Sequence, residues 1–246
     1  MESKSLLPRV WEVPAEFRNR LGATVGRQRA MAADGHLLLV LHVPPKPDEK
    51  ERQARFIWRK PDAMWTSNDL GGGPQAVGRH LDQFAKALEE CDDLEQQANR
   101  AEDYMEVLER LAPLQRSARN LHDVLQEARR LVPDDRELIN FRDRAYEIER
   151  TAELLQAETR YALDLLVAKK AEEQAKASRR MAVSSHRLNL LAAFFFPLAA
   201  LSGILGANLA HGFENYEPPL PFLAFVAVGL ISGLILASFV AASRRE

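Results

Sequence analysis

The sequence predicts an α+β membrane protein built from three parts in chain order. Short runs of β-forming residues indicate a small cytoplasmic α/β domain at 1–73, and a long helical pattern indicates a cytoplasmic helical domain at 74–187. Two runs without a charged side chain, 188–208 and 220–242, indicate a C-terminal transmembrane hairpin at 188–242. At ~1.5 Å per residue, each run is long enough to cross a hydrocarbon core of ~30 Å.

The composition excludes several classes of function. The formal net charge is -2, so no overall basic field attracts nucleic acid, and we expect no nucleic-acid partner. The single cysteine, Cys91, excludes an intramolecular disulfide and a cysteine-rich metal site. The histidines are scattered without metal-ligand spacing, and no nucleophile–base arrangement is discernible. We therefore expect neither an enzyme nor a covalently bound cofactor.

The N-terminal part is predicted to contain three to five strands and a short helix at 16–21. The dipeptide Asp34-Gly35 is typical of a tight turn and predicts a hairpin that joins 27–32 to the next apolar run. The glycine-rich stretch 71–74 is interpreted as a linker because no strand leads directly into it. The apolar runs interpreted as strands are 9–13, 36–43 and 55–58.

The helical domain begins with apolar residues at three- and four-residue steps, the spacing of one helix face. Pro113 is expected to break this pattern, which gives two antiparallel helices, with one kinked helix as the alternative. A new helix is predicted to start at about residue 134, because Asp134 and Glu137 match a capping box.

This last helix is predicted to form a long stalk, since neither proline nor glycine occurs between Asp134 and the first apolar run. A continuous helix to Leu205 is on the order of 100 Å long, too long to be stable on the surface of a monomer. A heptad-like seam along it indicates assembly into a bundle, so we expect a homo-oligomer. The seam consists of Leu138, Phe141, Ala145, Ile148, Ala152, Leu155, Thr159, Ala162 and Leu166.

The charges around the hairpin predict its orientation in the bilayer. Lysine and arginine residues precede the first run and follow the second, whereas the connecting loop, 209–219, contains none. By the positive-inside rule, both termini are cytoplasmic and the loop lies outside. In an oligomer, Glu214 and Glu217 of this loop repeat around its mouth and raise the local cation concentration, although they also fit ordinary solvated loop charges.

The end of the first run carries a family resemblance. Pro197 is followed about nine residues later by Gly206-Ala207-Asn208. This arrangement resembles the CorA-type divalent-cation transporters, in which the first membrane helix contains a proline and ends in Gly-Met-Asn. Ala207 replaces the methionine here. The resemblance implies a homopentameric funnel in the plasma (inner) membrane that takes up Mg²⁺ passively, together with Co²⁺ or Ni²⁺.

The resemblance also implies site residues. Gly206 and Asn208 would form the outer mouth, where Asn208 amide oxygens meet the water shell of a hydrated metal ion. The alternative is a plain helix C-cap. Further residues at steps of three and four share one helix face, which is either the pore lining or an ordinary apolar face. They are Leu188 as a hydrophobic gate, Ala192, Phe196 and Ala199.

Two other functions fit the same sequence. One is a ZntB-like zinc transporter of the same architecture, which differs in carrying Zn²⁺. The other is a non-conducting, membrane-anchored coiled-coil scaffold in which Gly-Ala-Asn is only a helix end. Ala182 and Ala199 stand where CorA-type relatives have polar residues, so conductance or selectivity is expected to differ. A ridge of small residues in the second run is expected to allow close helix packing; it consists of Gly229, Gly233, Ala237 and Ala241.

Overall fold

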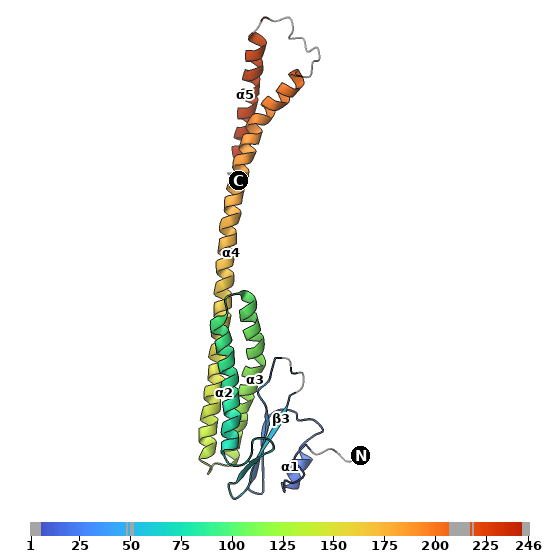
Figure 1. Cartoon of the computed structure of the whole chain (residues 1–246), viewed down its shortest axis with the longest axis vertical. Helices are drawn as coiled ribbons and strands as arrows, with labels where there is room; N and C mark the ends of the chain where they lie inside the picture. Colours follow the sequence, from blue (N-terminus) through green and yellow to red (C-terminus); the bar gives the residue numbers. More distant parts are fainter. Residues whose placement is uncertain (1–5, 48, 50–51, 207–216, 218, 243–246) are drawn as a thin grey trace. The chain divides into compact units, whose positions relative to one another are not determined.

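The computed structural model describes residues 6–47, 49, 52–206, 217 and 219–242 (Figure 1). The chain divides into two units, Met1–Ala168 and Lys169–Glu246. The elements are α1 (Ala15–Asn19), β1 (Arg29–Ala33), β2 (His36–His42), β3 (Ala54–Arg59), β4 (Trp65–Ser67), α2 (Gln75–Gln97), α3 (Ala101–Leu131), α4 (Glu137–Leu205) and α5 (Leu220–Ala242).

The strands of the first unit form one antiparallel sheet in the order β1-β2-β3-β4. Asp34 and Gly35 join β1 to β2 with φ angles of 49° and 76°, the left-handed conformation that a two-residue hairpin turn needs. The predicted hairpin is therefore confirmed, as are the strands at 36–43 and 55–58. The α+β class is also confirmed.

The strand predicted at 9–13 is wrong. The Trp11 N–H donates to the Pro8 carbonyl over 3.1 Å in a turn, and the segment then leads through Pro14 into α1. Trp11 and Val13 pack against the core on one face of the sheet, and the Trp11 and Trp58 ring centroids lie 5.6 Å apart, while Val10 is exposed. Trp11 and Val13 are alternate positions and lie toward the core, so they imitate the period of a strand although the segment pairs with none, which explains why the apolar run was misleading.

The sheet is buried on both faces, because successive side chains of a strand point to opposite sides. One face, including Leu39 and Ile57, belongs to the core that α2, α3 and the first part of α4 share. The other face, including Leu38 and Val40, packs against the N-terminal segment and α1. Cys91 of α2 is 6% exposed in the helical core, and this burial raises the pKa of its thiol.

The break between the first two long helices lies at 98–100, so the break predicted at Pro113 is wrong. Asp103 determines the position, because its Oδ2 accepts the backbone N–H groups of Asn99 (3.1 Å) and Arg100 (2.9 Å) at the start of α3. These hydrogen bonds to the carboxylate lower the pKa of Asp103. Pro113 lies inside α3, where its missing N–H costs one hydrogen bond without ending the helix.

The start of α4 is capped one residue later than predicted. Asp135, rather than Asp134, accepts the Glu137 N–H over 3.0 Å. The other oxygen of Asp135 accepts Arg59 Nε over 2.5 Å, and both side chains are largely buried, at 8% and 11% exposed. Asp135 therefore links β3 to the first turn of α4.

The α4 seam from Leu138 to Thr159 is buried inside a single chain, whereas Ala162 and Leu166 at its end are only partly buried, so the reasoning that a monomer would leave the seam exposed is wrong for most of its length. The side chains from Leu138 to Leu155 lie in the core with α2 and α3, and Thr159 is fully buried. Figure 1 shows α2, α3 and the first part of α4 side by side. Assembly of several copies must therefore use surfaces other than this buried part of the seam.

The second unit contains the last part of α4 and all of α5. Both helices include stretches long and apolar enough to cross a membrane, with mean hydropathies of 1.6 and 2.5. Pro197 lies inside α4, where its ring clashes with the carbonyl of Ala193 and removes a hydrogen bond. This explains the bend of α4 before its end, drawn in orange in Figure 1.

Candidate functional site

The predicted pore face of α4 is exposed to the outside of the second unit. Leu188 is 67% exposed and Phe196 is 71% exposed, and Ala192 and Ala199 are also exposed. These residues follow one another at helical steps, so they form one face. The structure thus places the predicted residues together, on a face that α5 leaves uncovered.

The other side of α4 packs closely against α5. A Cβ atom added to Gly233 would lie 2.4 Å from the carbonyl oxygen of Phe194, and one added to Gly229 would lie 2.5 Å from Leu198 Cδ1. Both glycines are buried. The small-residue ridge at these two positions therefore lets α5 approach the α4 backbone directly. This contact determines which face of α4 remains uncovered.

The predicted outer mouth is only partly within the described residues. Gly206 ends α4 with a hydrogen bond from its N–H to the Ser202 carbonyl over 2.9 Å. Its φ is not in the left-handed region, but an added Cβ would lie 2.9 Å from the same oxygen. Asn208 and Glu214 lie outside the described residues, and Glu217 is exposed. Their assignment to the mouth stays a prediction.

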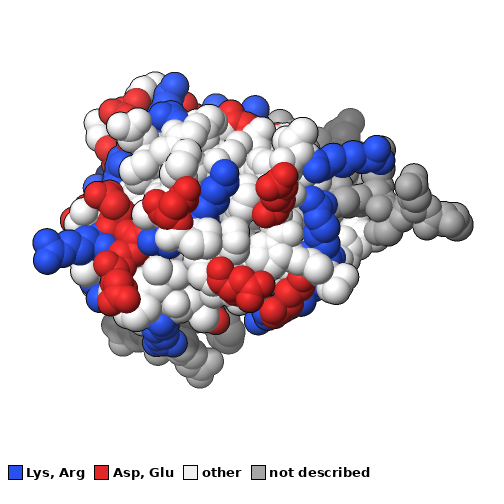
Figure 2. Space-filling view, turned by 90° about the horizontal axis from the view of Figure 1, so that it is seen from below, with Lys and Arg blue, Asp and Glu red and all other residues white. Residues whose placement is uncertain are grey.

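The described part of the chain contains no group of three or more His, Cys, Asp or Glu side chains that could hold a metal ion. In the view of Figure 2, acidic and basic side chains are interspersed among neutral ones, and neither sign forms a continuous patch. The described residues therefore do not indicate a metal site built from three such side chains.

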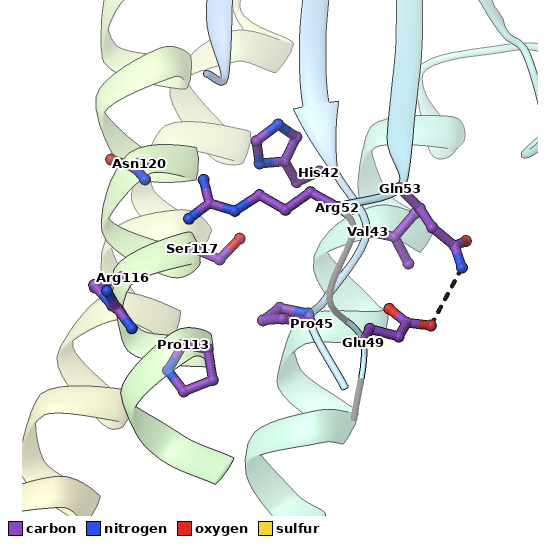
Figure 3. A pocket seen from close by; sticks show the side chains of 10 residues that line it. All are labelled: His42, Val43, Pro45, Glu49, Arg52, Gln53, Pro113, Arg116, Ser117 and Asn120. Carbon is purple, nitrogen blue, oxygen red and sulfur yellow. Dashed lines mark hydrogen bonds between the residues drawn. The ribbon is translucent and has the colours of Figure 1, made fainter. Parts of the chain in front are cut away.

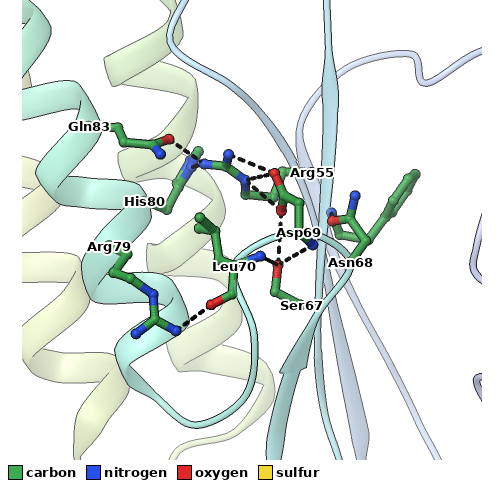
Figure 4. Close-up of polar contacts among 9 residues, drawn as sticks. Arg55, Ser67, Asn68, Asp69, Leu70, Arg79, His80 and Gln83 are labelled. Carbon is green, nitrogen blue, oxygen red and sulfur yellow. Dashed lines mark hydrogen bonds and ion pairs between the residues drawn. The ribbon is translucent and has the colours of Figure 1, made fainter.

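A buried polar cluster in the first unit was not found by sequence reasoning (Figure 4). Arg55 of β3, only 4% exposed, donates to both carboxylate oxygens of Asp69 over 2.8–3.0 Å. Its NH1 also contacts His80 Nδ1 and Gln83 Oε1 of α2, each over 2.7 Å. The signal in the sequence is an arginine inside an apolar strand, with a histidine on the apolar face of the next helix.

The electrostatics of this cluster follow from its burial. Burial of the His80 ring lowers its pKa most, and the charge of Arg55 lowers it further, to about 3. The ring is therefore neutral at physiological pH. For Asp69, burial favours the neutral acid, but the hydrogen bonds and charge of Arg55 outweigh it and lower the pKa. With Nδ1 accepting from Arg55, the His80 proton lies on Nε2, which has no partner among the described atoms. The cluster fastens α2 to the sheet.

Comparison with known proteins decides the family. The model of the family described as CorA-like Mg²⁺ transporter protein matches residues 74–245. The chain belongs to this family. CorA-like proteins are homo-oligomeric membrane transporters of divalent cations and not enzymes, so the predicted recognition and the membrane character are confirmed.

Two solved structures resemble the chain. The structure of the full-length CmaX protein has a TM-score of 0.50 and 16% identity, covering 89% of this chain and 76% of that one. The complete structure of the CorA magnesium transporter from Methanocaldococcus jannaschii has a TM-score of 0.41 and 15% identity, covering 87% and 80%. No curated protein matches the sequence. At these identities, the CmaX likeness shows the fold alone.

Proposed function

We propose that this CorA-like protein takes up divalent cations, with Mg²⁺ as its main substrate, by passive flow through a homopentameric pore. The pore is lined by the membrane segment 188–208, which includes the last part of α4. The loop 209–219 lies outside, and 220–242 returns to the cytoplasm. The domains at 1–73 and 74–187 form the cytoplasmic part of a funnel in the plasma (inner) membrane.

The observation that supports this proposal best is the uncovered face of α4. Leu188 and Phe196 are large, apolar and more than half exposed in a single chain, while α5 occupies the opposite side of the helix. When copies surround an axis with this face inward, Leu188 forms an apolar ring. Such a ring closes an ion path by excluding water.

The chemistry of the mouth suits a hydrated ion. Mg²⁺ gives up its water shell reluctantly, so neutral amide oxygens that contact this shell are suitable ligands for the passing ion. In the proposal, Asn208 supplies these oxygens, and Gly206 allows the chain to leave α4 close to the Ser202 carbonyl. Glu214 and Glu217 raise the cation concentration near the entrance.

The test is Mg²⁺ flux into liposomes that contain the purified full-length protein. Asn208→Ala removes the amide from every copy, and the helix end loses about 1 kcal/mol or less. We expect flux to fall severely while assembly is unchanged. Ser238→Ala is the matched control, because this exposed serine lies on α5 and not on the helix that carries the predicted pore face; its flux should equal that of the wild type.

The same liposomes separate the competing functions. Zn²⁺ flux well above Mg²⁺ flux assigns the ZntB-like alternative, and Co²⁺ and Ni²⁺ complete the selectivity series. Wild-type flux no greater than that of empty liposomes assigns the non-conducting scaffold. Native mass spectrometry in detergent tests the pentamer, and a monomer or dimer as the sole species excludes the pore.

A further inference from the structure

We infer that a pocket in the first unit binds a small tetrahedral dianion such as a phosphoryl group, and that His42 takes up a proton when the anion binds. The pocket lies between α3 and the connection from β2 to β3 (Figure 3). Its volume is about 50 Å³, enough for one or two waters or one small oxyanion. The inference is independent of transport.

The rim of the pocket carries two arginines that lack a carboxylate partner among the described residues. Arg52 extends toward α3 from the connection that precedes β3, and Arg116 extends from α3 (Figure 3). Arg116 donates its Nε–H to the Ala112 carbonyl over 3.3 Å, and its two terminal nitrogens have no hydrogen-bond partner among the residues that the structure describes. By contrast, Arg55 and Arg59 are both paired with aspartates. Guanidinium groups in this arrangement are suited to oxyanions.

The floor of the pocket is a buried and ordered polar network. Gln28, 5% exposed, donates to the carbonyl of Ser117 (3.0 Å) and to its hydroxyl oxygen (3.3 Å). Because the Ser117 hydroxyl accepts this bond, its own proton is available to a ligand. The side-chain oxygen Oε1 of Gln28 accepts the backbone N–H of His42 over 3.3 Å. This network holds Ser117 and His42 in place before a ligand arrives.

The ring of His42 is the group that takes up a proton when the anion binds. It is 3% exposed, and its Nε2 lies 2.9 Å from the Gly26 carbonyl oxygen, so Nε2 carries the proton of the neutral ring. The edge with Nδ1 is turned toward Arg52 and α3 in Figure 3. A neutral Nδ1 offers only a lone pair, which an anion cannot use. Protonation at Nδ1 converts this lone pair into a donor.

The groups around His42 favour the neutral ring while the pocket is empty. Burial lowers the pKa of His42 most, and the charges of Arg52 and Arg29 lower it further, against the opposite effect of the Gly26 carbonyl. Arg116 lies across the pocket from it, and nearby His80 is neutral. A bound dianion neutralises this positive field and raises the pKa. Glu49, which accepts a hydrogen bond from Gln53 over 3.2 Å, is the carboxylate among the described lining residues and opposes anion binding.

The probe is radiolabelled sulfate, whose charge stays at −2 across the pH range, in equilibrium dialysis against the detergent-solubilised full chain at constant ionic strength. We expect saturable binding that is several-fold tighter at pH 5.5 than at pH 7.5, because a bound dianion favours the protonated His42 ring. His42→Gln keeps a donor for the Gly26 carbonyl but does not titrate, so this pH dependence should disappear.

Four variants distinguish loss of the anion site from loss of the folded structure. Arg52→Gln and Arg116→Gln should each weaken sulfate binding about tenfold or more, since each removes a charge-assisted hydrogen bond. Glu49→Gln should tighten it, which an unfolded protein cannot do. Arg130→Gln, an exposed arginine on the same helix, is the matched control and should bind as the wild type does.

The remaining outcomes either identify the source of the bound anion or contradict the inference. Displacement of sulfate by inorganic phosphate assigns a free ion as the ligand, and displacement by ATP but not by phosphate assigns the phosphoryl group of a nucleotide. No saturable sulfate binding at millimolar concentrations overturns the inference. Equal binding by the wild type and both arginine variants overturns it as well.

Discussion

Replacing Gly233 by alanine should force α5 away from α4. The added Cβ would lie 2.4 Å from the Phe194 carbonyl oxygen, and side chains do not approach closer than 3.0 Å, so the helices must separate there by at least about 0.6 Å. A backbone carbonyl cannot rotate away as a side chain does. Overpacking of this kind costs about 1–3 kcal/mol.

Two other glycines provide matched controls for this prediction. At Gly229 the added Cβ meets Leu198 Cδ1, the end of a flexible side chain, so Gly229→Ala should cost less than Gly233→Ala. At Gly78 of α2 nothing lies within 4 Å, so Gly78→Ala should be neutral or stabilise the helix by about 0.5–1 kcal/mol.

The assay is thermal unfolding of the three purified variants in detergent, with flux measured in liposomes. For a chain of this size, 1 kcal/mol corresponds to about 2–4 °C in Tm. We expect Tm to fall most for Gly233→Ala, by several degrees, and its flux to fall as the pore face shifts. Equal Tm values for Gly233→Ala and Gly229→Ala would refute the direct contact between α5 and the α4 backbone.

Three further predictions concern pH, the ion pair and the topology. Below pH 6.5 the unfolded chain protonates His80 while the folded chain, with a pKa of about 3, does not. As the pH falls from 6.5 toward 3, the free energy of unfolding should therefore fall by up to about 1.4 kcal/mol per pH unit. His80→Asn should reduce this pH dependence, which thermal melts at pH 7.5 and pH 5 measure. Asp135→Asn keeps a helix cap but removes the charge that pairs with Arg59; it should lower the free energy of unfolding by about 3–5 kcal/mol, whereas Asp134→Asn should change it little in denaturant titrations. A membrane-impermeant maleimide should label a cysteine at Asn215 but not at Ser243 in intact cells, and the reverse labelling would contradict the orientation.

The elements that depend on local chemistry were predictable from the sequence. The Asp34-Gly35 turn determines its hairpin by itself, and the two apolar runs at the C-terminus are identified by their length and lack of charge. The helix break was misplaced because Pro113 is a conspicuous breaker, whereas the Asp103 side chain stabilises the real turn through two backbone N–H groups. A proline in mid-helix costs one hydrogen bond, and tertiary packing of α3 outweighs that cost.

The elements that depend on tertiary contacts were not predictable. The spacing from Leu138 to Leu155 identifies a buried helix face but does not tell whether the covering helices come from the same chain or from another one. The pairing of Arg55 with Asp69 and His80 requires knowing that β3 and α2 are neighbours. The pore face at Leu188 and Phe196 came from the family resemblance, and its exposure depends on where Gly233 places α5.

The burial of Cys91 has a practical consequence for labelling chemistry. Maleimides and similar reagents react with the thiolate, and a buried thiol with a raised pKa supplies little of it and admits the reagent poorly. The wild-type chain should therefore give a low background with such reagents while it stays folded. Single-cysteine probes can then be introduced without replacing Cys91, so that the helical core keeps its native packing. A burst of labelling at Cys91 on heating would in turn report when that core opens.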